Sequence, residues 1–198
     1  DWRLHYRSGI TPPSAEIVTV LRPLATSTAF VKSPPVTPDW TSGMRGSGTL
    51  SGSEPSGFTY VDEDGTHVAF DRIASQTFEV AEIVPPGGPA ISVSRAGNTT
   101  TYSAAGRSLA VSTFASGTNA GQIASVSGGG QTWTYTYAST DRLLTATGPD
   151  LSTPGNTSDQ VVWTYTYSGG LMSKVQRSAG GTTRTLGDWT YTSGRVAS

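Results

Sequence analysis

Residues 131–137 read Gln-Thr-Trp-Thr-Tyr-Thr-Tyr, and residues 161–167 repeat them as Val-Val-Trp-Thr-Tyr-Thr-Tyr. A shorter copy, Asp-Trp-Thr-Tyr, occupies residues 188–191. Each copy is followed by a turn and a short apolar segment, at residues 141–144, 170–172 and 194–196. One two-stranded unit cannot bury its own apolar face, so a repeat of about 20 to 30 residues predicts a stacked array of β-hairpins.

The aromatic residues of these copies alternate with threonine, which predicts aromatic side chains on one sheet face and threonines on the other. The aromatic positions are Trp133, Tyr135, Tyr137, Trp163, Tyr165, Tyr167, Trp189 and Tyr191. The favoured interpretation is a structural ladder in which neighbouring repeats pack ring on ring. In that case Trp163→Ala should cost about 3–5 kcal/mol of stability. The other interpretation is an exposed aromatic platform that binds a sugar or an unfolded polypeptide.

The composition predicts an all-β, antiparallel fold with many turns. Among the 198 residues are 24 glycines, abundant serine and threonine, and only two lysines, Lys32 and Lys174. Leu, Lys, Glu and Gln are too sparse for many stable helices, whereas Thr, Val, Tyr and Trp favour strands. We therefore expect a wall or barrel-like array of β-hairpins.

Regular spacing of strands and turns begins near residue 58. Residues 1–57 are expected to form an irregular N-terminal β segment, with strands near 1–8, 16–21 and 28–31 and an exposed Gly/Ser-rich loop over 41–57. Residues 58–198 are expected to form the hairpin repeats. The first hairpin should join residues 58–61 to 67–70 through Asp62-Glu63-Asp64-Gly65-Thr66, since Asp and Gly tolerate turn dihedral angles.

Charge and hydropathy exclude several function classes. A net charge of −1 provides no basic excess to neutralise a phosphate backbone, so nucleic-acid binding is not expected. No apolar run approaches the roughly 18 residues of a membrane-spanning helix. The chain contains no cysteine, which excludes disulfides, thiol nucleophiles and thiolate metal sites.

No catalytic or metal-binding constellation stands out, and we expect neither an enzyme nor a cofactor. The two histidines, His5 and His67, each lie in a strand-like run, and no Gly-x-Ser-x-Gly elbow is present. A two-histidine metal site would require the first strand and the later hairpin to meet. Residues 62–64 lack the glycine and glutamate spacing of a calcium loop, and the acids show no specific glycosidase pair.

The aromatic-threonine strand, the turn and the Gly-Arg-Leu-like return segment resemble the YD repeat of the Rhs family. Residues 58–70 resemble the hairpin that precedes such repeats, and residues 1–8 resemble the opening of an Rhs shell. The aspartate expected after the last tyrosine of the repeat is replaced by Ala138, Ser168 and Thr192. The chain therefore looks like the first part of a shell with degenerate repeats.

The resemblance implies a structural role. Complete Rhs shells coil a long β-ribbon into a hollow container around a C-terminal, often toxic polypeptide that is delivered to another cell. The expected partners are further repeats of the same polypeptide and the enclosed polypeptide, and the expected location is secreted or at the cell surface. Self-association through an unpaired strand near Trp189–Tyr191 is also expected. The alternative function is a secreted or cell-surface β module that binds carbohydrate through its aromatic rows.

Overall fold

Antiparallel strands are the predominant secondary structure of the computed structural model, which describes residues 2–10, 15–23, 26–33, 37–42, 47–138, 141–149, 160–193 and 195–197. Seventeen strands belong to one hydrogen-bonded system, and two more form a separate small ladder. The all-β antiparallel hairpin array expected from the sequence is confirmed. The described residues include no helix that is long and apolar enough to cross a membrane.

The chain divides into two compact units. Residues 1–94 and 102–106 form the first, and residues 95–101 and 107–198 form the second. Strands β9 (Ile91–Ala96) and β10 (Thr99–Ala104) lie across the division. The division therefore falls well after residue 57, where the regular punctuation of the sequence begins.

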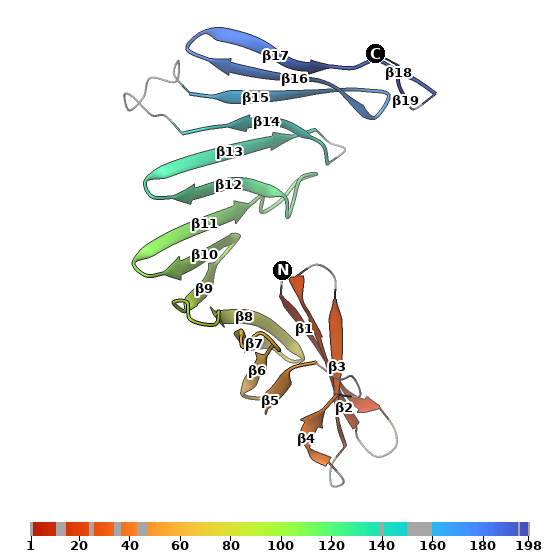
Figure 1. The fold of residues 1–198 in the computed structure, drawn as a ribbon, viewed down its shortest axis with the longest axis vertical. Coiled ribbons are helices and arrows are strands. Elements are labelled where there is room, and N and C mark those ends of the chain that lie inside the picture. The colour runs from red at the N-terminus through yellow and green to blue at the C-terminus, as the bar shows by residue number, and fades with distance from the viewer. Residues whose placement is uncertain are drawn as a thin grey trace. The chain divides into compact units, whose positions relative to one another are not determined.

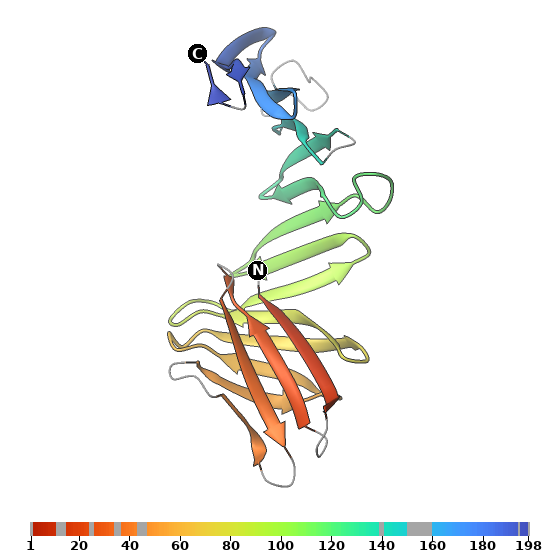
Figure 2. The same ribbon diagram turned by 90° about the vertical axis from the view of Figure 1, so that its right-hand side faces the viewer.

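The first unit consists of two layers of antiparallel strands (Figures 1 and 2). One layer contains β1 (Arg3–Ile10), β2 (Ala15–Leu21), β3 (Ser27–Ser33) and β4 (Thr37–Thr41). The other contains β5 (Thr49–Ser53), β6 (Gly57–Val61), β7 (His67–Ala74) and β8 (Thr77–Val84). Strand β1 pairs with both β2 and β8, with Leu4 opposite Phe78, and so joins the layers.

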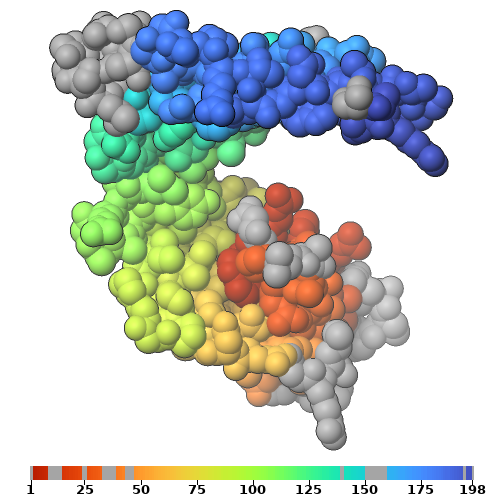
Figure 3. All heavy atoms as spheres, turned by 45° about the horizontal axis from the view of Figure 1, so that its top comes forward, coloured from red at the N-terminus to blue at the C-terminus, as the bar shows by residue number. Residues whose placement is uncertain are grey.

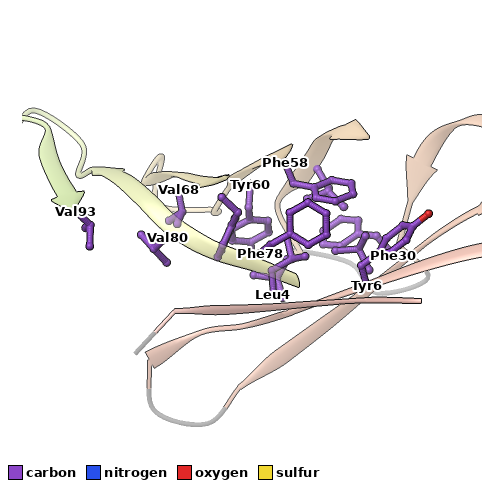
Figure 4. Close-up of a cluster of buried hydrophobic side chains, with 13 residues drawn as sticks. Leu4, Tyr6, Phe30, Phe58, Tyr60, Val68, Phe78, Val80 and Val93 are labelled. Atoms are coloured by element: carbon purple, nitrogen blue, oxygen red, sulfur yellow. The ribbon is translucent and has the colours of Figure 1, made fainter. Parts of the chain in front are cut away.

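The core of the first unit lies between these layers. Alternate residues of each strand point inward, as Val18 and Val20 do from β2 and Val68 and Phe70 from β7. The rings of Phe58 and Phe78 meet edge to face at 4.9 Å. Figure 4 shows these side chains filling the space between the layers, and Figure 3 shows atoms of β1–β3 in direct contact with those of β6–β8. The strands expected in residues 1–57 are thus regular and carry half of a core.

Part of the expected loop over residues 41–57 is instead strand β5. Its Leu50 is buried opposite Tyr60 of β6. Gly52 has φ +108°, and a Cβ there would lie 2.2 Å from the carbonyl oxygen of Gly57. The glycines that suggested a loop therefore permit close contact between the backbones of two paired strands. Residues 43–46 of this stretch lie outside the described residues.

The expected turn between β6 and β7 is confirmed. Val61 pairs with His67, the Asp62 N–H donates to the Thr66 carbonyl at 2.8 Å, and Gly65 has φ +86°. The Thr66 N–H donates to Asp64 Oδ1 at 2.7 Å, and this bond lowers the pKa of Asp64. The acidic cluster therefore shapes a turn, as Asp commonly does.

Asp62 also links this turn to the core. Its Oδ1 accepts a hydrogen bond from the Tyr60 hydroxyl at 2.9 Å and forms an ion pair with Arg22 Nη1 at 3.0 Å. Tyr60 is fully buried, and its hydroxyl also lies 3.0 Å from the Ser47 carbonyl oxygen. Burial, then the hydrogen bond to Asp62 and its negative charge, raise the pKa of Tyr60 to about 12.

The second unit is a single layer in which consecutive strands pair in chain order (Figure 1). Its strands are β11 (Arg107–Thr113), β12 (Ile123–Gly128), β13 (Gln131–Tyr137), β14 (Leu143–Thr147), β15 (Val162–Ser168), β16 (Leu171–Ala179), β17 (Thr182–Asp188), β18 (Tyr191–Thr192) and β19 (Arg195–Val196). Ala146 is its one buried apolar side chain among the described residues. This unit has paired strands without a core.

Alkaline pH should destabilise the protein through Tyr60. A tyrosine in the unfolded chain loses its proton near pH 10, whereas Tyr60 in the folded chain keeps its proton until about pH 12. This contribution to stability is complete below about pH 10, and about 2–3 kcal/mol of it is lost as pH rises to about 12. Urea unfolding of the wild type and Tyr60→Phe across this range measures the effect. Equal pH slopes for the two proteins would contradict the assignment.

Candidate functional site

The register of the second unit brings one line of side chains onto a single sheet face. Tyr135 of β13 lies opposite Ala146 of β14, and Ala146 lies opposite Trp163 of β15. Trp163 in turn lies opposite Arg177 of β16, which lies opposite Arg184 of β17. Directly paired residues of an antiparallel sheet share a face. The line therefore crosses five strands, from an aromatic end to a basic end.

All eight aromatic residues expected at the site are half-buried. Trp133, Tyr135 and Tyr137 lie on β13, and Trp163, Tyr165 and Tyr167 on β15. Trp189 follows β17, and Tyr191 begins β18. On β13 the three aromatic residues alternate with exposed threonines, as the sequence predicts. The structure thus gives the repeat an aromatic face and a threonine face.

The predicted ring-on-ring contact between repeats is not made by the described residues. Strand β14 lies between β13 and β15, and its small residue Ala146 separates Tyr135 from Trp163. The ring pair found in the described part of this unit joins Tyr137 to Phe114, at 6.2 Å. Burial, followed by the neighbouring Tyr135, raises the pKa of Tyr137. The aromatic residues of β13 and those of β15 therefore form two rows, which the small residue Ala146 of β14 separates.

Two of the three tryptophans in the repeats lie against a glycine, Trp133 against Gly148 after β14 and Trp189 against Gly187 two residues earlier in the chain. A Cβ added to Gly148 would lie 3.1 Å from the Trp133 ring, and one added to Gly187 would lie 2.3 Å from the Trp189 ring. An aromatic ring placed on a glycine covers backbone that has no side chain of its own. Trp133 and Trp189 thus have a structural position, whereas the cross-strand partners of Trp163 are Ala146 and Arg177.

The last tyrosine of a repeat is bonded to the backbone of an earlier segment. The Tyr167 hydroxyl donates to the Leu143 carbonyl at 3.0 Å, and the Tyr191 hydroxyl donates to the Met172 carbonyl at 2.6 Å. The Arg142 guanidinium also lies over the Tyr167 ring at 5.5 Å. These contacts connect the second and third copies of the repeat to the segments that precede them.

Two adjoining hollows open on the aromatic face. The first, of about 370 Å³, is lined by Trp133, Tyr135, Ala146, Trp163 and Tyr165. The second, of about 360 Å³, is lined by Gln131, Trp133, Gly148, Pro149, Val161, Trp163 and Arg177. Trp133 and Trp163 border both hollows, and the small residues of β14 leave the space between them. Apolar walls with a few polar groups are typical of small-ligand sites.

The two histidines lie apart in the first unit, and the described residues show no metal-binding cluster. His5 pairs with Thr77 at one end of β8, whereas His67 pairs with Val84 at the other end, so the two histidines do not meet. Among the described residues no cluster of three or more His, Asp or Glu could hold a metal ion. The aromatic face itself offers ring faces, an amide and a guanidinium group to a ligand.

No protein-family model matches the chain, and no curated protein matches it.

Two features of this face do not follow from the sequence pattern. The pairing of Arg177 with Arg184 depends on the register of β16 and β17, and the contact of Trp133 with Gly148 depends on the register of β13 and β14. The Gly180-Gly181 turn between strands of nine and seven residues is a usable signal for the arginine pairing, because a two-residue turn fixes the register of its strands.

Replacing Trp163 by alanine should destabilise the protein less than a ladder requires. Its ring borders two open hollows, so we expect a loss of about 1–2 kcal/mol. Phe58→Ala, in the closed core of the first unit, serves as a reference with an expected loss of about 3–5 kcal/mol. Urea unfolding measures both. Equal losses would restore the closed aromatic ladder as the better description of Trp163.

Proposed function

We propose that this chain is a structural segment of an Rhs/YD-repeat shell and has no catalysis of its own. In this proposal its sheet forms part of a wall around a C-terminal toxin or effector polypeptide, and its partners are that polypeptide and further repeats. The protein is then secreted or presented at the cell surface by a delivery system. The sequence resemblance supplies the family, and the geometry of the second unit is consistent with it.

The observation that carries the proposal is the open, repetitive second unit. Its strands follow one another in chain order, and Tyr167 and Tyr191 bond to earlier segments in closely similar ways. Both faces are half-exposed, with Ala146 as the one buried apolar side chain described. A layer of this kind is suited to a wall, because it separates two compartments without a thick core.

Protection of an enclosed polypeptide tests the shell. The full-length protein is treated with a protease in two conditions, with and without a mild denaturant that opens the wall. A C-terminal polypeptide that resists cleavage until the denaturant is added supports the proposal. Cleavage of that region at equal rates under both conditions contradicts it.

The hollows on the aromatic face favour a second candidate function, a carbohydrate-binding β module. Trp163 borders both hollows without the glycine contact of the other two tryptophans. A glycan array compares wild type with Trp163→Ala. Glycan binding that Trp163→Ala abolishes, with the unfolding midpoint little changed, supports this function, and absence of binding by the wild type opposes it.

The strand near Trp189–Tyr191 is not the unpaired edge expected from the sequence, because Tyr191 lies opposite Val196 of β19 and the Trp189 N–H donates to the Ser173 carbonyl. We expect self-association through the edge of β17 instead. Within the described part of its unit β17 pairs with β16 alone, so its other edge offers unpaired N–H and C=O groups. Leu186, 48% exposed, lies on this strand. Leu186→Lys should shift the protein toward monomer in light scattering, because edge charges disfavour strand pairing.

Leu144→Lys is the matched control, since Leu144 is also exposed but β14 is paired on both sides. Hydrogen exchange provides a second readout. A wild-type monomer, with exchange of the Thr182–Asp188 amides that does not depend on protein concentration, would contradict self-association through β17.

A further inference from the structure

Arg177 and Arg184 form an uncompensated like-charge pair on the aromatic face. They lie directly opposite each other on β16 and β17, and both are exposed. Like charges in direct cross-strand positions destabilise a sheet. The fold therefore bears a cost at this position that a neutral residue would remove.

The described carboxylates of the second unit are engaged elsewhere. Asp141 accepts a hydrogen bond from Gln122 Nε2 at 2.6 Å, and Asp188 pairs with Lys174 Nζ at 3.1 Å. No ion pair joins Arg177 or Arg184 to the described residues of this unit. Both guanidinium groups are thus available to an anion from outside the chain.

Arg177 and Arg184 continue the line of side chains that runs beside the two hollows. Arg177 lines the second hollow together with Trp133 and Trp163, and Arg184 follows it on the next strand. An indole ring binds the apolar face of a pyranose, whereas a guanidinium binds a carboxylate through two parallel hydrogen bonds. The indole ring of Trp163 and the guanidinium group of Arg177 belong to directly paired residues of neighbouring strands.

We propose that this line binds an acidic oligosaccharide that contains uronic acid residues. The pyranose rings stack on Trp163 and on the hollow walls, and the carboxylates bind Arg177 and Arg184. Neighbouring strands are about 4.8 Å apart, close to the length of one pyranose unit, so successive sugars meet successive strands. This inference deepens the carbohydrate-binding candidate and rests on it; the shell proposal stands independently.

Binding of oligogalacturonate to the full 198-residue chain tests the proposal, with a neutral galactan oligosaccharide of equal length as the comparison ligand. Isothermal titration calorimetry should detect the acidic ligand and show weaker or no binding of the neutral one. Arg177→Gln and Arg184→Gln should each weaken binding about tenfold or more, because each removes a charge-assisted contact. High salt should weaken binding as well.

Arg107→Gln is the matched control, since Arg107 is an exposed arginine of β11, outside the line. It should leave binding unchanged. The unfolding midpoints of Arg177→Gln and Arg184→Gln should stay level or rise, because each variant relieves the like-charge pair. Weak binding caused by misfolding would instead lower the midpoint, so the two causes are distinguishable.

Three results would overturn the proposal. Equal affinity for the acidic and neutral oligosaccharides would remove the role of the arginines. Equal loss of binding in Arg107→Gln would make the attraction a general charge effect. Binding of poly-glutamate as tight as that of oligogalacturonate would assign the face to an acidic polypeptide. Loss of this sugar site would leave the protease-protection result for the shell unaffected.

Discussion

The cross-strand hydrogen-bond ladder is the interaction on which the second unit depends. A typical β domain combines such a ladder with a core between two layers, and the first unit does so through Phe58, Tyr60 and Phe78. The second unit has the ladder but only one buried apolar side chain among its described residues, Ala146. Its strands must therefore be held in place by contacts within a single layer.

Three kinds of contact provide this support. Tryptophan rings cover glycines, as Trp133 covers Gly148 and Trp189 covers Gly187. Tyrosine hydroxyls bond to carbonyl groups of earlier segments. On the opposite face hydroxyls pair across strands, as Thr136 with Thr145 at 2.6 Å. Each contact contributes modestly, but repetition along the array makes them additive between neighbouring units.

The fold class followed from local patterns, because alternation and turn residues act over a few positions. The turn at residues 62–66 and the copies at 131–137 and 161–167 are formed as their sequences indicate. Glycine was harder to interpret, since Gly52 serves paired strands whereas Gly180 and Gly181 form a turn with positive φ. Composition alone does not distinguish these two uses.

Only the aromatic part of the candidate site could be predicted, because the site combines side chains from different strands. The aromatic rows repeat along the sequence, so their common face was foreseen. The pairing of Arg177 with Arg184 was not, since it joins residues whose neighbourhood depends on the register of one hairpin.

The repeat also assigns different roles to residues that look equivalent in sequence. On the side of the following strand Trp133 lies against Gly148, whereas Trp163 lies opposite Arg177. On the side of the preceding strand the partners are Val126 for Trp133 and Ala146 for Trp163. Trp133 and Trp163 both border the open hollows, but the Trp133 ring also covers the backbone at Gly148, whereas among the described residues no glycine contact holds the Trp163 ring. The copies of the repeat are not identical. A single copy can therefore differ in the surroundings of its tryptophan while the backbone hydrogen bonds between the strands stay the same.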